Sequence, residues 1–144
     1  MISETSADLW QARRIVVPVN TMGVMGAGVA LEAKRRFPWC VGPYITACHQ
    51  GRLGPRQGLV INNPTGGQNL VLVATKKAWY HDSTLDYVNS CLAWLASQPF
   101  TGDVSMPRIG CGRGGLDWSS VRPLVYQHLE SAGFNVIIHN RGEQ

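Results

Sequence analysis

The sequence predicts an α/β domain in which helices cover both faces of a mostly parallel or mixed β-sheet. Strand-like and helix-like segments alternate along the chain, which is the pattern of such folds. Two glycine-rich loops, at residues 20–28 and 107–115, each follow an apolar segment and precede a helical one. The length of 144 residues fits one domain with its own core. We therefore expect a single domain over residues 1–144.

In the first half of the chain, the pattern favours two strands and two helices. The segment 14–19 is rich in β-branched residues, which is typical of a buried strand. Pro38 stops the first helix and Gly51 ends the second. The expected elements are an edge strand, a short turn, the buried strand and the two helices, at residues 1–6, 8–12, 14–19, 28–37 and 44–50.

In the second half, two strands joined by a turn precede helices that alternate with strands. Turn-forming residues at 63–67 predict a hairpin or tight loop. Ser83 or Thr84 can cap the next helix. The core face expected for that helix consists of Leu85, Val88, Leu92 and Leu95. The expected elements are strands at 58–62 and 69–74, a helix at 84–97, a strand at 103–106, a helix at 118–132 and a strand at 134–139.

Composition is that of an ordinary globular protein. No segment approaches the ~20 apolar residues of a membrane span, and residues 1–6 lack the features of a secretory signal. The four cysteines contain no CxxC pair, so we interpret them as reduced thiols of a cytoplasmic protein. Histidines and acidic residues show no ligand spacing, so neither a metal nor another cofactor is expected.

Charge allows a polyanionic partner without requiring one. Thirteen basic and nine acidic residues give a net charge of +4, which permits binding to DNA or RNA. The basic residues occur as separate pairs and triplets, such as Lys34-Arg35-Arg36 and Lys76-Lys77. On charge alone, a solvated surface is the favoured interpretation.

The two glycine loops predict a bound anion. A glycine loop between a strand and a helix lets backbone N–H groups approach an anion, and the helix N-terminus adds a partial positive charge. The loops read Asn20-Thr21-Met22-Gly23-Val24-Met25-Gly26-Ala27-Gly28 and Pro107-Arg108-Ile109-Gly110-Cys111-Gly112-Arg113-Gly114-Gly115. Together they predict a pyrophosphate held from both sides, and hence a nucleotide-like ligand.

These loops resemble those of the macrodomain family. Residues 20–30 and 110–118 match the two family motifs in order and spacing, and the resemblance runs from about residue 8 to residue 139. Within the family, the chain is most similar to DarG-type antitoxin macrodomains, which remove ADP-ribose from DNA bases modified by DarT toxins. The resemblance implies a three-layer α/β/α macrodomain with a central mixed sheet and a surface cleft for ADP-ribose.

The resemblance also implies which residues bind ADP-ribose. Asp8 would accept a hydrogen bond from the adenine amino group, although a cap for the turn at 8–12 fits it equally well. Asn20 would hold the distal ribose, and His139 lies where family members often place an aromatic ring against adenine. The other expected binding residues are Thr21, Gly26, Ala27 and Gly28 in the first loop and Gly110, Cys111, Gly112, Arg113 and Gly114 in the second.

Lys76 is the expected catalytic residue. It follows the apolar segment 70–74, so its ammonium group should emerge at a strand end beside the ligand. In DarG-like enzymes the lysine at this position is taken to act on the N-glycosidic bond between ribose C1″ and the base. Lys76 would protonate the leaving base or the ribose ring oxygen, with its pKa lowered by burial or by Lys77. The alternative is a solvated lysine that attracts phosphate.

The second loop lacks a carboxylate that a related enzyme uses. A mammalian glycohydrolase that releases ADP-ribose from glutamate pairs its lysine with an aspartate where this chain has Gly114. Asp117 follows in the sequence and is expected to cap the helix that starts at Trp118. The glycine matches the DarG pattern and favours a DNA-linked substrate over a protein-linked one.

Further candidates lie near the expected cleft. His49 is a possible second acid or base, although a surface histidine fits the sequence better. Trp79 and Tyr80 would stack on a flipped or single-stranded base, or pack in a lid, and His81-Asp82 would line the entrance. Cys111 has no histidine nearby in the sequence to activate it, so we interpret it as a packing residue.

The sequence thus predicts a glycosidase that removes ADP-ribose from thymidine or guanosine in single-stranded DNA and reverses a DarT-like toxin. Its expected ligand is the ADP-ribose moiety of that DNA, a DarT-like toxin is a candidate partner, and no membrane is involved. Antitoxin action, DNA repair and phage defence are the biological roles that this implies. The alternatives are a protein that binds ADP-ribose without cleaving it, and a hydrolase of protein-linked ADP-ribose or ADP-ribose 1″-phosphate.

Overall fold

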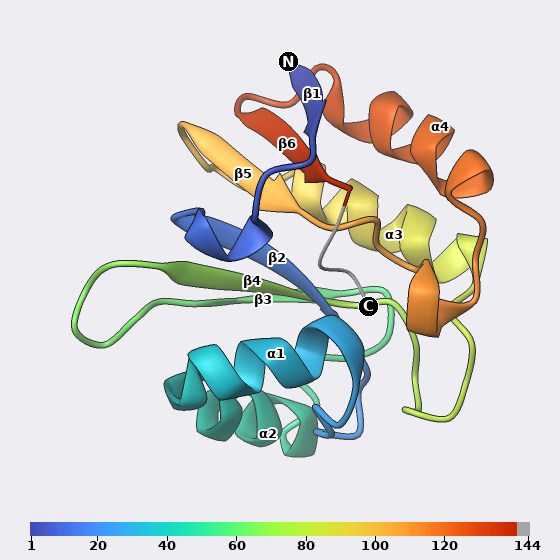
Figure 1. Ribbon diagram of the computed structural model, residues 1–144. Helices are drawn as coiled ribbons and strands as arrows, with labels where there is room; N and C mark the ends of the chain where they lie inside the picture. The colour runs from blue at the N-terminus through green and yellow to red at the C-terminus, as the bar shows by residue number, and fades with distance from the viewer. Residues whose placement is uncertain (141–144) are drawn as a thin grey trace.

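The computed structural model describes residues 1–140, which form a six-stranded sheet between two layers of helices (Figure 1). The strands are β1 (Ile2–Thr5), β2 (Arg14–Val19), β3 (Gly58–Ile61), β4 (Asn69–Ala74), β5 (Asp103–Met106) and β6 (Asn135–His139). The α-helices are α1 (Gly28–Arg36), α2 (Val41–His49), α3 (Leu85–Ala96) and α4 (Trp118–Leu129). Short 3₁₀ helices occur at η1 (Leu9–Gln11), η2 (Pro38–Cys40) and η3 (Gly112–Gly114). Within these residues, no helix is both long and apolar enough to cross a membrane.

The strand order across the sheet is β1-β6-β5-β2-β4-β3. Neighbouring strands are parallel except β3 and β4, which form the antiparallel pair that the turn at 63–67 predicted. The predicted fold class, an α/β/α arrangement around a mixed sheet, is therefore confirmed. Because β2, β4, β5 and β6 run in the same direction, the loops that follow them leave from one edge of the sheet.

Alternate residues of the central strands face opposite helical layers. In β2, Ile15 and Val17 belong to the core that includes α1 and α2, whereas Val16 belongs to the core that includes α3 and α4. In β4, Leu72 and Val71 are divided between the same two cores. Figure 1 shows α1 and α2 together on one side of the sheet and α3 and α4 on the other. Burial on both faces explains why these strands are continuous apolar runs.

Two predicted features of the middle helices are wrong. α2 begins at Val41, before the predicted position 44, because Pro38 starts η2 and Pro43 fits the first turn of a helix, where no N–H donor is needed. Thr84 caps α3 with its side chain, as predicted. Leu85 was expected in the core but is 40% exposed. It is the first residue of the helix, one turn before the buried Val88.

The last helix begins at Trp118 as predicted, but its cap and its C-terminal end differ from the prediction. Asp117 occupies the N-cap position of α4, but its side chain makes no capping hydrogen bond. Its backbone oxygen accepts hydrogen bonds from the N–H groups of Ser120 (3.0 Å) and Val121 (3.2 Å) instead. The helix ends at Leu129, short of the predicted 132. The predicted electrostatic role of Asp117 at this terminus does not depend on a direct bond.

β2 and β5 are neighbours whose following loops go to opposite faces of the sheet. The two strands pair at Ile15 and Ser105. Further along β2, Pro18 has no N–H group to donate to a neighbouring strand. The chain leaves β2 for the α1 layer and leaves β5 for the α4 layer. Such a switch point opens a crevice at the C-terminal strand ends, where α/β sheets bind ligands.

Candidate active site

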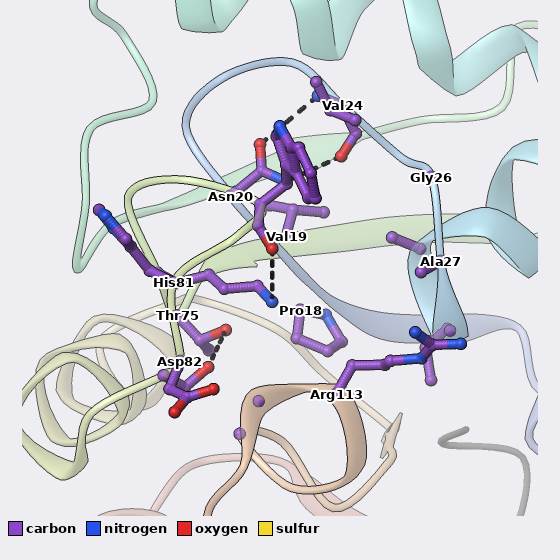
Figure 2. Close-up of a pocket in the computed structure, with 18 of the residues that line it drawn as sticks. Pro18, Val19, Asn20, Val24, Gly26, Ala27, Thr75, His81, Asp82 and Arg113 are labelled. Carbon is purple, nitrogen blue, oxygen red and sulfur yellow. Dashed lines mark hydrogen bonds between the residues drawn. The ribbon is translucent and has the colours of Figure 1, made fainter.

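A cavity of about 590 Å³ opens at this edge of the sheet, between the loops that follow β2, β4 and β5. Figure 2 shows Asn20 and Val24 on one side of it, Asp82 on the opposite side and Pro18 between them. Pockets for small organic ligands commonly have volumes of about 300–1,000 Å³. The size and place of the cavity therefore suit the nucleotide-like ligand that the glycine loops predict.

Asn20 stabilises the first glycine loop through hydrogen bonds of its side chain. Its side chain is 5% exposed, its Nδ2 donates to the Val24 oxygen (2.8 Å), and its Oδ1 accepts from the Met22 N–H (2.9 Å). The buried Tyr44 hydroxyl donates to the Asn20 backbone oxygen (2.6 Å) and lies 3.1 Å from Oδ1. Asn20 lines the cavity, and its second Nδ2 hydrogen is the donor left for a ligand.

The first loop leads directly into α1, and the start of this helix forms one wall of the cavity. Gly26, Ala27 and Gly28 line that wall. Ala27 occupies the N-cap position with an extended backbone, and no side chain caps the helix. The N–H groups of a first helical turn have no partner within the helix and carry a partial positive charge. This wall therefore suits a phosphate group, as the sequence predicts.

The second glycine loop forms the opposite wall, through Gly110, Cys111, Arg113 and Gly114. Gly110 has a φ of +79°, and a Cβ at this position would lie 2.9 Å from side-chain atoms of both Leu116 and Val88. Glycine is thus required here by conformation and by space. The exposed Arg113 side chain extends toward the side of the cavity that Ala27 lines (Figure 2). Its guanidinium adds a fixed positive charge to the wall.

Hydrogen bonds join the three loops around the cavity. The N–H and hydroxyl groups of Thr21 both donate to the Lys77 backbone oxygen, at 3.0 and 2.8 Å. The Ser83 N–H donates to the Gly114 oxygen (2.9 Å), and the Ser83 hydroxyl lies 3.3 Å from that of Thr75. The segment after β4 is therefore fixed to the first loop at one end and to the second loop at the other.

Lys76 lies at the end of β4, on the same cavity as both glycine loops. Its side chain is partly buried, and Nζ donates to the Trp79 backbone oxygen at 3.4 Å. Burial has the largest effect on the pKa of this ammonium group and lowers it; the charge of Asp82 raises the pKa and that of Arg113 lowers it. The net lowering makes Lys76 a better proton donor than an ordinary lysine.

A carboxylate reaches the second glycine loop from a different segment of the chain. Asp82 lines the cavity, and a Cβ on Gly115 would lie 3.2 Å from its carboxyl carbon. A Cβ on Gly114 would likewise lie 2.8 Å from Ser83 Oγ. Among the described residues that line the cavity, Asp82 is the one carboxylate. The sequence placed Asp82 at the entrance but gave no local signal that it contacts this loop.

Other predicted residues lie in different places. Trp79 lines the cavity, with Tyr80 and His81 beside it. Thr21 and Gly112 belong to the two loops but do not line the cavity; Thr21 is occupied by its bonds to the loop after β4. His49 is an exposed residue at the end of α2 and lies outside the cavity, which favours the interpretation as a surface histidine.

Asp8 and His139 line a second cavity, of about 630 Å³. Asp8 caps η1, because its Oδ1 accepts from the Trp10 N–H at 3.1 Å, which is the alternative role that the sequence left open. His139 is 5% exposed, and its Nδ1 lies 3.0 Å from the Ala7 oxygen. Its Nε2 is buried and has no hydrogen-bond partner within residues 1–140. The two residues predicted to contact adenine are therefore together, in a cavity other than that of the glycine loops.

Burial makes two of the four thiols less reactive. In the described part of the chain, no group of three or more histidine, cysteine or acidic residues is arranged to hold a metal ion. All four cysteines are free, and burial raises the pKa of Cys40 to about 11 and of Cys91 to about 12. Thiols with raised pKa values are poor nucleophiles. Cys111 lines the cavity, and its Sγ lies 3.7 Å from the Ile109 oxygen.

Comparisons with known proteins agree with this geometry. The family model of the Macro domain matches residues 16–125. A DNA ADP-ribosyl glycohydrolase of Thermus aquaticus is 34% identical over 122 residues, which cover 81% of this chain and 34% of that protein. The chain thus spans between 34% and 38% of the length of the first curated relatives that it matches.

Solved structures share the fold. The macrodomain of Mycobacterium tuberculosis DarG superposes with a TM-score of 0.87 at 30% identity, over 98% of each chain. Thermosipho africanus DarTG in complex with ADP-ribose superposes with a TM-score of 0.82 at 25% identity, over 95% of this chain and 41% of that one.

Proposed function

The chain belongs to the Macro domain family, and from this premise we propose that it is a DNA ADP-ribosyl glycohydrolase. In this proposal, residues 1–144 form one macrodomain that removes ADP-ribose from thymidine or guanosine in single-stranded DNA. The relative from Thermus aquaticus, which carries that activity in its name, supports the assignment. A DarT-like toxin is the proposed source of the substrate, and the four free cysteines fit a cytoplasmic site of action.

The observation that carries the proposal is the place of Lys76. Its ammonium group lies on a cavity whose two walls are glycine loops, one of them ending in an uncapped helix N-terminus. A pyrophosphate between these walls would meet backbone N–H groups on one side and Arg113 on the other. The sugar attached to it would then be held near Lys76 and Asn20.

Asp8 and His139 are proposed to hold the adenine end of the ligand, which would then extend from the glycine-loop cavity into the second one. Both line the second cavity, and the buried His139 Nε2 has no partner within the described residues. A buried polar atom without a partner costs free energy that a ligand can recover by bonding to it. Asp8 accepts from the Trp10 N–H and from Gln11 Nε2 (3.4 Å), and a carboxylate can accept several hydrogen bonds at once, including one from an amino group.

The proposed reaction is hydrolysis of an N-glycosidic bond. The bond between ribose C1″ and the base nitrogen breaks, a water oxygen forms a new bond to C1″, and the base takes up a proton. The water loses one proton in forming that bond, which balances the proton that the base takes up. Lys76, with its lowered pKa, is the proton donor, either to the leaving base or to the ribose ring oxygen. Asp82 is proposed to stabilise the positive charge that develops on the sugar and to orient the attacking water.

A DNA-linked substrate is favoured over a protein-linked one by the second loop. The backbone at Gly114 is covered by Ser83, so position 114 has no room for a side chain that reaches the ligand. The carboxylate in the cavity comes instead from Asp82, in the segment after β4. Relatives that are named DNA ADP-ribosyl glycohydrolase and are 34% and 35% identical to this chain support the same substrate class.

The test is release of ADP-ribose, followed by mass spectrometry, from single-stranded oligonucleotides that carry one ADP-ribosyl thymidine or guanosine. We expect wild-type protein to release ADP-ribose and Lys76→Ala to lose about 10²–10⁴-fold in rate, the usual contribution of general acid catalysis. Calorimetry should show that Lys76→Ala still binds ADP-ribose. Binding without release by the wild type would instead identify a non-catalytic ADP-ribose-binding protein.

A further inference from the structure

Three aromatic side chains form one rim of the cavity and are open to water. We call Trp79, Tyr80 and His81 the aromatic rim; all three line the cavity that holds Lys76. Trp79 is 57% exposed and Tyr80 is 65% exposed. Large apolar side chains that gather at one exposed place usually mark an interaction site. Their exposure at the mouth of the cavity therefore marks them as a candidate contact surface.

The backbone of the rim is fixed while its rings remain uncovered. Lys77, before the rim, accepts two hydrogen bonds from Thr21, and Ser83, after it, donates to Gly114. Between them Ala78 is buried and accepts a hydrogen bond from the His81 N–H (3.0 Å). A rim that is anchored at both ends loses little conformational entropy when a partner binds to it.

The rings of the aromatic rim also contact one another edge to face. The centroids of Trp79 and Tyr80 are 5.3 Å apart with an interplanar angle of 89°, and those of Tyr80 and His81 are 4.8 Å apart at 75°. Edge-to-face contacts of this kind are favourable between aromatic rings. Successive rings stand at steep angles to each other, so a flat partner can stack on an open face of one of them.

Three basic side chains lie on or next to the cavity that the aromatic rim lines, together with one carboxylate, Asp82. Lys77 is exposed, and Lys76 and Arg113 line the same cavity. Within residues 1–140 none of these three cations forms an ion pair, whereas Arg36, Arg56 and Arg122 do. Aromatic faces beside unpaired cations are the combination that binds single-stranded nucleic acid, because bases stack on the rings and phosphates approach the cations. A peptide would use the cations but has no general need for the rings.

We propose that Trp79 and Tyr80 stack on the bases next to the modified nucleotide in single-stranded DNA, with Lys77 at a flanking phosphate. This inference rests on the proposed function, which places the modified base beside Lys76. It adds that the protein recognises the strand as well as the ADP-ribose. Duplex DNA is disfavoured, since its base faces are already stacked on their neighbours.

The first test measures strand binding without any catalysis. The probe is a dye-labelled, unmodified single-stranded oligothymidine, and its affinity is followed by fluorescence anisotropy. We expect Trp79→Ala and Tyr80→Ala each to weaken binding by about five- to a hundredfold, the usual range for one stacked base, and Trp79→Phe to restore part of the loss. Val60→Ala, which trims an exposed apolar residue on β3, should leave affinity unchanged.

Salt dependence tests the place of Lys77. For single strands, each phosphate contact contributes about 0.7 to the slope of log affinity against log salt concentration. Lys77→Ala should lower the slope by about that amount, whereas Lys34→Ala, an exposed lysine in the last turn of α1, should not. Equal slopes for wild type and Lys77→Ala would remove Lys77 from the proposal.

The second test compares two substrates in turnover. The ratio of kcat/KM on an ADP-ribosylated oligonucleotide to that on the ADP-ribosylated nucleoside should fall at least fivefold in the double variant Trp79→Ala/Tyr80→Ala. If wild type cleaves neither substrate, the proposed function fails, while the anisotropy still tests the rim. If wild type cleaves both and the ratio and DNA affinity do not change in the variant, the rim proposal is refuted. Loss confined to protein-linked ADP-ribose would also refute it, in favour of a peptide.

Discussion

The hydrogen bond from Tyr44 to Asn20 makes a quantitative prediction about the first glycine loop. Tyr44 is fully buried on α2, and burial raises the pKa of its phenol, so the hydroxyl remains a donor at any ordinary pH. It donates to the Asn20 backbone oxygen at 2.6 Å. Tyr44→Phe keeps the ring and removes this donor. A buried acceptor left without its partner costs about 1–3 kcal/mol, and we expect the free energy of unfolding to fall by that amount.

The assay is urea unfolding, in which the midpoint should fall while the slope with denaturant stays the same. Tyr126→Phe is the matched control. Its hydroxyl also bonds to an acceptor, Glu4 at 2.9 Å, but at the surface, where Arg122 remains bonded to the same carboxylate. We expect a change within about 0.5 kcal/mol for this control. A loss for Tyr44→Phe no larger than that for Tyr126→Phe would refute the idea that this bond holds the loop.

Four further predictions concern the cavity and the core. If Lys76 acts as an acid, kcat/KM should fall as the pH rises through the pKa of Lys76. The midpoint of that fall should lie below the ordinary lysine pKa of 10.5. Activity that rises with pH would instead identify the neutral amine as the reactive form. Asp82→Asn removes the charge that raises this pKa, so the midpoint should move to still lower pH, which a pH–rate profile measures. Gly114→Ala places a Cβ 2.8 Å from Ser83 Oγ, and we expect it to weaken ADP-ribose binding in calorimetry more than Gly42→Ala, whose Cβ would meet nothing within 4 Å. Cys91, with its pKa raised to about 12 by burial, should react with a thiol reagent only after urea unfolds the protein.

Much of the fold follows from short-range patterns in the sequence. Buried strands such as β2 are runs of β-branched residues, and each glycine loop is bounded by a strand and a helix, so local signals located the elements. Helix starts were less predictable where proline was involved, because Pro38 ended one helix as expected but also began η2. The exposed Leu85 shows that periodicity alone does not tell which end of a helix leaves the core.

The site was predictable as far as it lies on the two glycine motifs. Lys76 was predicted from two signals together: it follows a buried strand that ends at the ligand edge of the sheet, and it matches the lysine of the family that the glycine motifs resemble. The contact of Asp82 with the second loop was not, since it joins segments more than thirty residues apart and leaves no periodic signal. The place of Asp8 in the second cavity was not predictable either, because segments far apart in the sequence, residues 7–14 and 101–105, line that cavity together.

The anchors on either side of the aromatic rim have a consequence for how such a domain can diverge. Thr21 and Gly114 hold the backbone at Lys77 and Ser83, whereas the side chains at 79–81 contribute little to the buried core. Replacing those three residues would therefore leave the phosphate walls and the lysine in place. Substitutions at residues 79–81 can therefore change which polymer a domain of this kind prefers, while the residues that hold the phosphates and Lys76 stay the same.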